Sequence, residues 1–374
     1  MGQLATNPDS NPVIMGGFLS GLQTANPAEV DAMLDDAVTN PALITWFPYL
    51  QASVLIDDKG LARIHRSLEL GHSPIERYSH LAWGRASDPI SGPAFRDLVM
   101  AICAKGGIDS ALHMVSMRLV SDKVQKRAPL PETFEAGRSV LAAFELGTSK
   151  RQIQREDHEL GSLAQVCLVG VDGERVARRL VRMLKEASVD YKLNAHDYDD
   201  LVKGLFAVQA TAALDEMFTG DEASVKIGVR FVETLTRRRA SPLDGVAPPT
   251  LIAWCNTDPE SRYLIAATAG SLFKKDNNGA PFHWTALAPL LLQGAPDPTA
   301  MLSVFVRRLY PNSWGGSWAT EMEGRARLLE QLDVCDNADL KAARKDVLDR
   351  LRSQIEEARV REAAEDKQRN ARFE

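Results

Sequence analysis

The feature that most constrains the fold of this chain is a recurring signal for the start of an α-helix. Asparagine or aspartate stands directly before proline at Asn26, Asn40, Asp258 and Asp297. Such a side chain can cap the free N–H groups of the first turn, and proline fits the first helical position because its missing N–H would have no partner there. After Asp297, apolar residues recur at helical spacing over 301–309. These signals predict a chain built mainly from helices.

Other segments show the helical period without proline. Residues 59–70 and 94–104 each place apolar side chains three or four positions apart. Asp172 and Asn194 are predicted caps of two further helices, and the first of these carries arginines and Lys185 on its outward face.

Strand signals are scarce and short. Only residues 53–56 and 165–171 look β-like, and the second run could open a strand–turn–helix unit. A short apolar run cannot be distinguished from a buried helix by pattern alone, so an α/β insertion at 165–171 stays open as an alternative.

The length of the chain requires more than one core. It has 374 residues, whereas a single hydrophobic core stops growing at roughly 250–300 residues. Helix pairs recur about every 35–45 residues, which suits HEAT or armadillo repeats that bury their apolar faces on one another. We therefore predict an all-α fold, an α-solenoid of stacked antiparallel helix pairs with roughly 15–18 helices and a charged C-terminal helix.

Composition shifts suggest three regions. Residues 1–12 are expected to form a flexible N-terminal segment, residues 13–336 the solenoid, and residues 337–374 the charged helix. Polar, proline-rich stretches at 121–133 and 237–250 are candidate sub-boundaries. Beyond Glu356 the chain is almost all charge and alanine, so we expect the far end of the last helix to leave the body. Alternatively, its apolar side caps the last repeat.

Composition excludes several classes of protein. The chain is 45% hydrophobic and 25% charged, so it can form a core and is not disordered as a whole. Its longest apolar stretches, such as 286–292, are far shorter than the roughly 20 residues that cross a bilayer. A net charge of −6 argues against a general nucleic-acid binder. No signal-peptide pattern is visible, and we expect a cytoplasmic protein.

The four cysteines form no paired motif. Cys103, Cys167, Cys255 and Cys335 lie far apart among apolar neighbours. That setting favours reduced thiols in the core over a zinc site, although an even number also permits two disulfides.

Sequence motifs for catalysis are absent. We find no phosphate loop, dinucleotide fingerprint, HExxH or GxSxG, and we predict no catalytic residues, no metal and no cofactor. His158 and His196 each lie beside acidic residues, but neighbours on a helix point in different directions and cannot converge on one ion. Asp221 and Glu222 with Lys226 resemble a nuclease pattern without its strands. An enzyme whose site combines distant residues remains an alternative.

Basic and aromatic runs supply the candidate binding residues. Basic residues cluster in 175–185, in 237–239, at Lys274-Lys275 and at 307–308. They form either solvated helix faces or a stripe that binds phosphates or an acidic partner. The SWGGSW turn places two tryptophans near residues 307–308, either as a structural corner or as a contact site. The predicted binding residues are Arg178, Arg179, Arg182, Arg237, Arg238, Arg239, Arg307, Arg308, Trp314 and Trp318.

The stretch from Asp258-Pro259-Glu260-Ser261-Arg262 through Ser313-Trp314-Gly315-Gly316-Ser317 resembles the C-terminal parts of large HEAT-like bacterial proteins. This resemblance implies a stand-alone relative or a fragment of a longer protein, and a role in a larger defence or signalling assembly. We predict a non-enzymatic scaffold or recognition module that binds a protein partner and no membrane. The main alternative is a nucleic-acid-binding solenoid that uses the arginine stripes.

Overall fold

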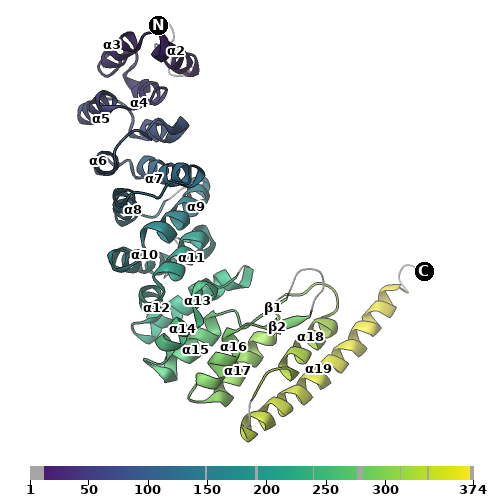
Figure 1. Cartoon of the computed structure of the whole chain (residues 1–374). Coiled ribbons are helices and arrows are strands. Elements are labelled where there is room, and N and C mark those ends of the chain that lie inside the picture. The colour runs from purple at the N-terminus through teal and green to yellow at the C-terminus, as the bar shows by residue number, and fades with distance from the viewer. Residues whose placement is uncertain are drawn as a thin grey trace. The chain divides into compact units, whose positions relative to one another are not determined.

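The computed structural model describes residues 12–147, 150–189, 193–238, 240–275, 281–311, 313–334 and 337–370. In this part of the chain the regular structure is helical apart from two three-residue strands, so the all-α class is confirmed (Figure 1). The chain divides into two compact units. Unit 1 comprises Met1–Leu184 with Asp197–Gln209, and unit 2 comprises Lys185–His196 with Ala210–Glu374. The domain boundaries expected from composition stay predictions.

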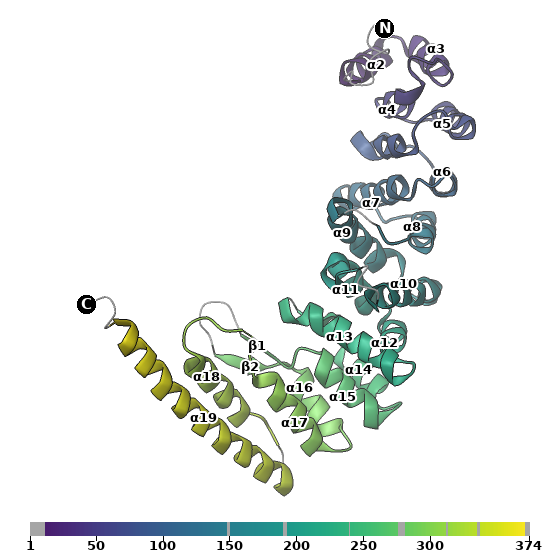
Figure 2. The ribbon, with the colours of Figure 1, turned by 180° about the vertical axis from the view of Figure 1, so that it is seen from behind.

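In unit 1, helices pack mainly on their near neighbours in the chain; α7, for example, contacts α6, α8 and α9 (Figure 2). The elements with residues in this unit are α2 (Val13–Ala25), α3 (Pro27–Ala37), the 3₁₀-helix η1 (Ile44–Trp46), α4 (Phe47–Ala52), α5 (Asp58–Leu70), η2 (Ile75–Arg85), α6 (Gly92–Ala104), α7 (Ile108–Val124), α8 (Pro131–Ala143), α9 (Lys150–Cys167), α10 (Val171–Val189), η3 (Ala195–Tyr198) and α11 (Asp199–Val208).

In unit 2, helices again contact neighbours one or two elements away, and a short antiparallel hairpin packs against α16 and α18. Its elements are α12 (Ala210–Phe218), α13 (Glu222–Arg238), η4 (Pro242–Gly245), α14 (Pro248–Cys255), α15 (Pro259–Ala269), β1 (Phe273–Lys275), β2 (Phe282–Trp284), α16 (Leu287–Gly294), α17 (Pro298–Leu309), α18 (Trp318–Glu330) and α19 (Ala338–Asn370). Phe273 pairs with Trp284 in the hairpin.

The predicted helix starts are confirmed in part. The side chain of Asn26 accepts a hydrogen bond from Glu29 N, and that of Asp297 accepts from Thr299 N and Ala300 N. Asp258 precedes α15 without making a side-chain cap bond. Asn40 is followed by turns and η1 instead of an α-helix, with its Oδ1 accepting from Ala42 N.

The structure differs from the sequence-based expectations at four further points. Residues 53–56 form no strand, and residues 165–171 comprise the end of α9, a short turn and the first residue of α10. Asp172 lies inside the first turn of α10, so it is not the cap. Lys185 is buried and donates to the carbonyl oxygens of Glu216 and Thr219 at the end of α12.

Helices α9 and α11 approach very closely through two glycines. A Cβ added to Gly161 on α9 would lie 2.6 Å from the carbonyl carbon and oxygen of Asp200, and one added to Gly204 on α11 would lie 2.8 Å from Gly161 O. Any larger residue at Gly161 would push the two backbones apart. This contact sets the spacing of the last two helices assigned wholly to unit 1.

A side chain of α9 also caps α11. Tyr198, the residue before α11, makes no side-chain cap bond. Instead Asp157 Oδ2 accepts from Asp200 N at 3.0 Å, and its Oδ1 accepts from Leu201 N at 2.8 Å. Asp157 is 8% exposed, and burial raises the pKa of its carboxyl to about 6, against the pull of these two N–H donors.

The last helix, α19, lies beside α18 in both views (Figures 1 and 2). Leu351, Ile355 and Ala358 are buried. Further along, the Glu362 carboxylate accepts hydrogen bonds from Ser317 Oγ at 2.6 Å and from Trp318 N at 2.8 Å, which caps α18. The expectation that α19 leaves the body after Glu356 is therefore wrong up to Glu362, and the described side chains beyond it are exposed.

Candidate functional site

Helix α2 carries no charged side chain, yet little of it is buried. Its 13 residues bury only Gly16 and Leu19. Gly16 allows α2 to approach α4 closely, since a Cβ at this position would lie 2.5 Å from Ser53 Oγ and 2.9 Å from the ring of Tyr49. Packing thus explains the glycine at position 16, whereas a Cβ at Gly17 would have no atom within 4 Å. Most of its apolar side chains remain outside the core.

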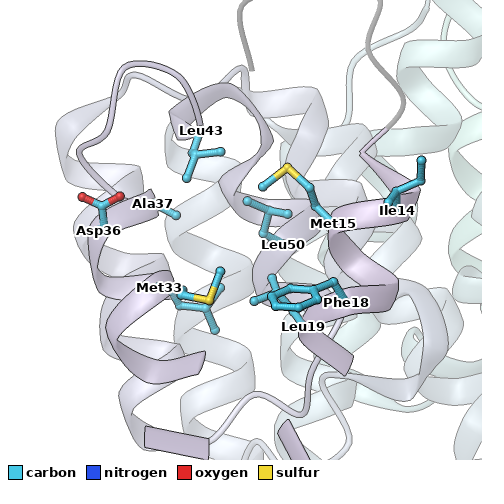
Figure 3. Close-up of a pocket in the computed structure, with 10 residues that line it drawn as sticks. Ile14, Met15, Phe18, Leu19, Met33, Asp36, Ala37, Leu43 and Leu50 are labelled. Atoms are coloured by element: carbon cyan, nitrogen blue, oxygen red, sulfur yellow. The ribbon is translucent and has the colours of Figure 1, made fainter. Parts of the chain in front are cut away.

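Between α2 and α3 lies an apolar groove of about 280 Å³. Side chains of α2 and α3 face one another across it, and the groove continues to α4 (Figure 3). Ile14 is 69% exposed and Phe18 is 52% exposed at its edge. The groove is lined by Ile14, Met15, Phe18, Leu19, Met33, Leu34, Asp36, Ala37, Leu43 and Leu50.

The charged side chains of α3, which borders this groove, are all acidic. Asp36 is the charged member of the lining, and Glu29 lies seven residues earlier on the same face of the helix. Both carboxylates accept hydrogen bonds from neighbouring asparagine amides, Asp36 from Asn40 and Glu29 from Asn26. The groove therefore combines an apolar floor with an acidic edge.

The predicted arginines of α10 contact the structure around them. Arg178 pairs with Glu174 one turn earlier at 2.9 Å. Arg179 donates to the carbonyl oxygen of Phe144 at 2.9 Å and pairs with Glu145. The contacts of Arg179 hold α10 to the segment that follows α8. The side chain of Arg182 is exposed. Their role in binding stays a prediction.

The predicted arginine pair at the end of α17 lies in a polar groove of unit 2. Arg307 and Arg308 line it together with Lys274, Lys275 and Arg325. Lys274 and Lys275 are a basic pair already in the sequence, whereas Arg325 has no such neighbour, and only the fold brings β1 and α18 beside α17. The side chains of Arg237 and Arg238, and all of Arg239, lie outside the described residues.

The two predicted tryptophans have different surroundings. Trp314 is 52% exposed in the turn before α18. Trp318 is half-buried and, with Tyr310 and Gln354, lines a small hollow beside α19. Whether they act as a structural corner or as a contact site stays a prediction.

Residues of the histidine and acidic motifs form two-residue ion pairs. His158 contacts Asp200 at 3.4 Å at an exposed position, and Lys226 pairs with Glu222 within α13. In the described part of the chain, no group of three or more His, Cys, Asp or Glu residues is placed to hold a metal ion. Likewise, none of the helices described is both long and apolar enough to cross a membrane.

Three cysteines are free thiols. Cys167 and Cys255 are buried and Cys103 is half-buried, as expected for reduced core residues. Burial raises the pKa of Cys103 to about 11 and that of Cys167 and Cys255 to about 12. Because the thiolate is the reactive species, these groups are poor nucleophiles at neutral pH. Cys335 lies outside the described residues.

Comparison of the chain with family models, with curated proteins and with solved structures finds no match in any of the three.

Proposed function

We propose that this protein is a non-enzymatic recognition module, a HEAT- or armadillo-like helical-repeat protein that binds a partner protein through unit 1. Support for the repeat architecture comes from the packing of each helix on its near neighbours in the chain. In such stacks a helix face without a neighbouring helix must be polar or be covered by something else.

A single observation carries the protein-binding proposal: α2 is an uncharged helix that leaves Val13, Ile14 and Phe18 exposed. Scattered apolar residues are common on protein surfaces, but a contiguous exposed set beside a groove is typical of an interaction site. Met15 and Met33 add flexible side chains that can adapt to a partner.

The occupant that fits this groove is an amphipathic helix of a partner protein. A helix can lay an apolar stripe into a groove between two helices, with anchors three or four residues apart. Glu29 and Asp36 sit along one face of α3, which has no basic residue. We therefore expect lysine or arginine beside the apolar stripe of the partner, where opposite charges would fix its direction.

A photo-crosslinking amino acid in place of Phe18 tests this proposal in cells. We expect the crosslinked peptide to come from a helical segment with an apolar stripe and flanking basic residues. A synthetic copy of that segment should bind the purified chain, and Phe18→Asp should weaken binding at least roughly tenfold, as for a central apolar contact. Val360→Asp, at an exposed apolar position on α19, is the matched control.

Two results would contradict the proposal. Crosslinks from position 18 to residues 1–11 of the same chain would show that the protein covers its own groove. Equal binding of the peptide to wild type and Phe18→Asp would place the interface elsewhere.

A further inference from the structure

A second surface lies wholly within unit 2, and it differs from the α2 groove in its chemistry. It is a polar groove of about 960 Å³ between α13, α15, β1, α17 and α18. Hydroxyl groups of Thr236, Thr268, Ser271 and Ser313 are among its lining. Hydroxyls and cations together are the groups that proteins use to hold phosphate oxygens.

Positive charge exceeds negative charge along this groove. Five cationic side chains line it: Lys274, Lys275, Arg307, Arg308 and Arg325. Among the described residues, their ion-pair partners include Asp244, Glu233 and Glu321. Of these carboxylates Glu233 lines the groove itself, so the lining is basic in a chain whose net charge is −6.

The cations differ in how firmly they are held. Arg325 is fixed, because it pairs with Glu321 at 2.8 Å and donates to Leu309 O at 2.7 Å. Lys274 and Lys275 are about half exposed, and their ion pairs with Asp244 and Glu321 are longer, at 3.2 and 3.3 Å. Such exposed pairs contribute little and can exchange for another anion.

Arg307 is the cation most available to a ligand. It lies on the last turn of α17, is exposed, and makes no ion pair among the described residues. Arg308, its neighbour, donates instead to Gly270 O at 3.1 Å. At the end of α17 the groove is thus lined by one guanidinium that is held by a hydrogen bond, that of Arg308, and by the exposed guanidinium of Arg307.

Two exposed aromatic residues belong to the segment that follows Arg307 and Arg308 in the chain. Tyr310 lines the groove and is 40% exposed, while its hydroxyl donates to Gln354 Oε1 at 2.9 Å and so fixes the ring. Trp314 follows Ser313, another lining residue, and exposes about half of its surface. A basic groove with exposed aromatic rings at its edge is the arrangement that binds single-stranded nucleic acid, since phosphates follow the cations and unpaired bases stack on the rings.

We propose that the groove of unit 2 binds a short single strand of RNA or DNA. Lys274, Lys275 and Arg307 contact the phosphates, and Tyr310 and Trp314 stack on bases. A duplex is a poorer fit because its bases are already stacked and cannot cover these rings. An acidic protein segment would satisfy the cations but would leave the rings without flat partners.

Fluorescence polarisation of labelled oligo-dT and oligo-U with the full chain tests this inference over a range of salt concentrations. Three phosphate contacts predict a slope of log affinity against log salt near −2, from about −0.7 per contact on a single strand. Arg307→Glu should weaken binding and make the slope shallower by about 0.7. Arg350→Glu, an exposed arginine of α19 outside the groove, makes the same charge change and should leave binding intact.

The aromatic part of the inference is tested by Trp314→Ala. Loss of one stacked base should weaken binding roughly 5- to 150-fold and leave the salt slope unchanged. A polyglutamate peptide of equal charge serves as competitor. The inference is overturned if the oligonucleotides fail to bind at low salt, or if Arg350→Glu weakens binding as much as Arg307→Glu. It is also overturned if Trp314→Ala has no effect on oligonucleotide binding while polyglutamate binds as tightly as the oligonucleotides. That last pattern would identify an acidic protein segment as the ligand.

Discussion

The buried cap Asp157 predicts an unusual dependence of stability on pH. Two effects oppose each other at this carboxylate. Two N–H donors at the start of α11 favour its charge, whereas burial and the nearby Asp199 and Asp200 disfavour it. Burial is the larger effect, because the pKa rises from 3.8 to about 6 in the folded protein. Asp199 itself is paired with Lys203 at 2.8 Å, and Asp200 is half exposed near His158.

The sign follows from proton binding. Between pH 4 and pH 6 the folded protein holds a proton on Asp157 that the unfolded chain has released, so the free energy of unfolding falls as pH rises. A shift of about two pKa units corresponds to about 3 kcal/mol between pH 4 and pH 7. If the N–H donors dominated instead, the pKa would lie below 3.8 and this contribution would have the opposite sign.

Asp157→Asn isolates this contribution. The amide resembles the protonated acid in shape and cannot ionise, but its NH₂ group faces a backbone donor, which costs about 1 kcal/mol. We expect the variant to be less stable than wild type by about 1 kcal/mol at pH 4 and more stable by about 1–2 kcal/mol at pH 7.5. Urea unfolding followed by circular dichroism at both pH values measures the difference, and other titrating groups cancel in the comparison. A difference that stays constant with pH, or a wild type favoured at pH 7.5, would refute the reasoning.

Two further predictions concern packing and capping. Gly161→Ala should lower the free energy of unfolding by about 1–3 kcal/mol, because its Cβ collides with the backbone of Asp200. The control is Gly21→Ala on α2, where a Cβ would have no atom within 4 Å. This variant should not be destabilising in the same urea unfolding assay. Equal effects of the two glycine variants would contradict the close approach of α9 and α11. Glu362→Ala should cost about 1 kcal/mol by removing the acceptor of the Trp318 and Ala319 N–H groups, although Ser317 still accepts from Thr320 N. Faster amide hydrogen exchange at Trp318 and Ala319 would identify the site of the loss, and Glu365→Ala on the exposed end of α19 serves as the control.

Local signals in the sequence predicted helices well and caps less well. Asn26 and Asp297 cap their helices through neighbours two or three residues away, so the pattern alone contains the necessary information. Asp258 has the same pattern, yet its side chain makes no cap bond. The caps supplied by Asp157 and Glu362 come from more than 40 residues away in the chain. No local pattern can predict such partners, because they depend on which helices pack together.

The candidate surfaces show the same limit. Arg307 and Arg308 were identifiable as a basic pair, but Lys275 and Arg325 join them only through the packing of the hairpin on α18. The α2 groove did have a signal in the sequence, since residues 13–25 contain no charge. That run is too short to indicate a membrane helix, and its pattern alone does not distinguish an exposed helix from a buried one. Exposure is decided by how many neighbours a helix has, which depends on the tertiary packing.

The high pKa values of Cys103, Cys167 and Cys255 have a practical consequence for studying both surfaces. Maleimides react with thiolates, so at neutral pH these three positions should stay unlabelled in the folded protein. Once Cys335 is replaced by serine, a cysteine introduced at Ser20 or Ser313 would carry a dye as the single reactive thiol. Each groove could then report its own ligand by a change in fluorescence, without disturbing the native interior.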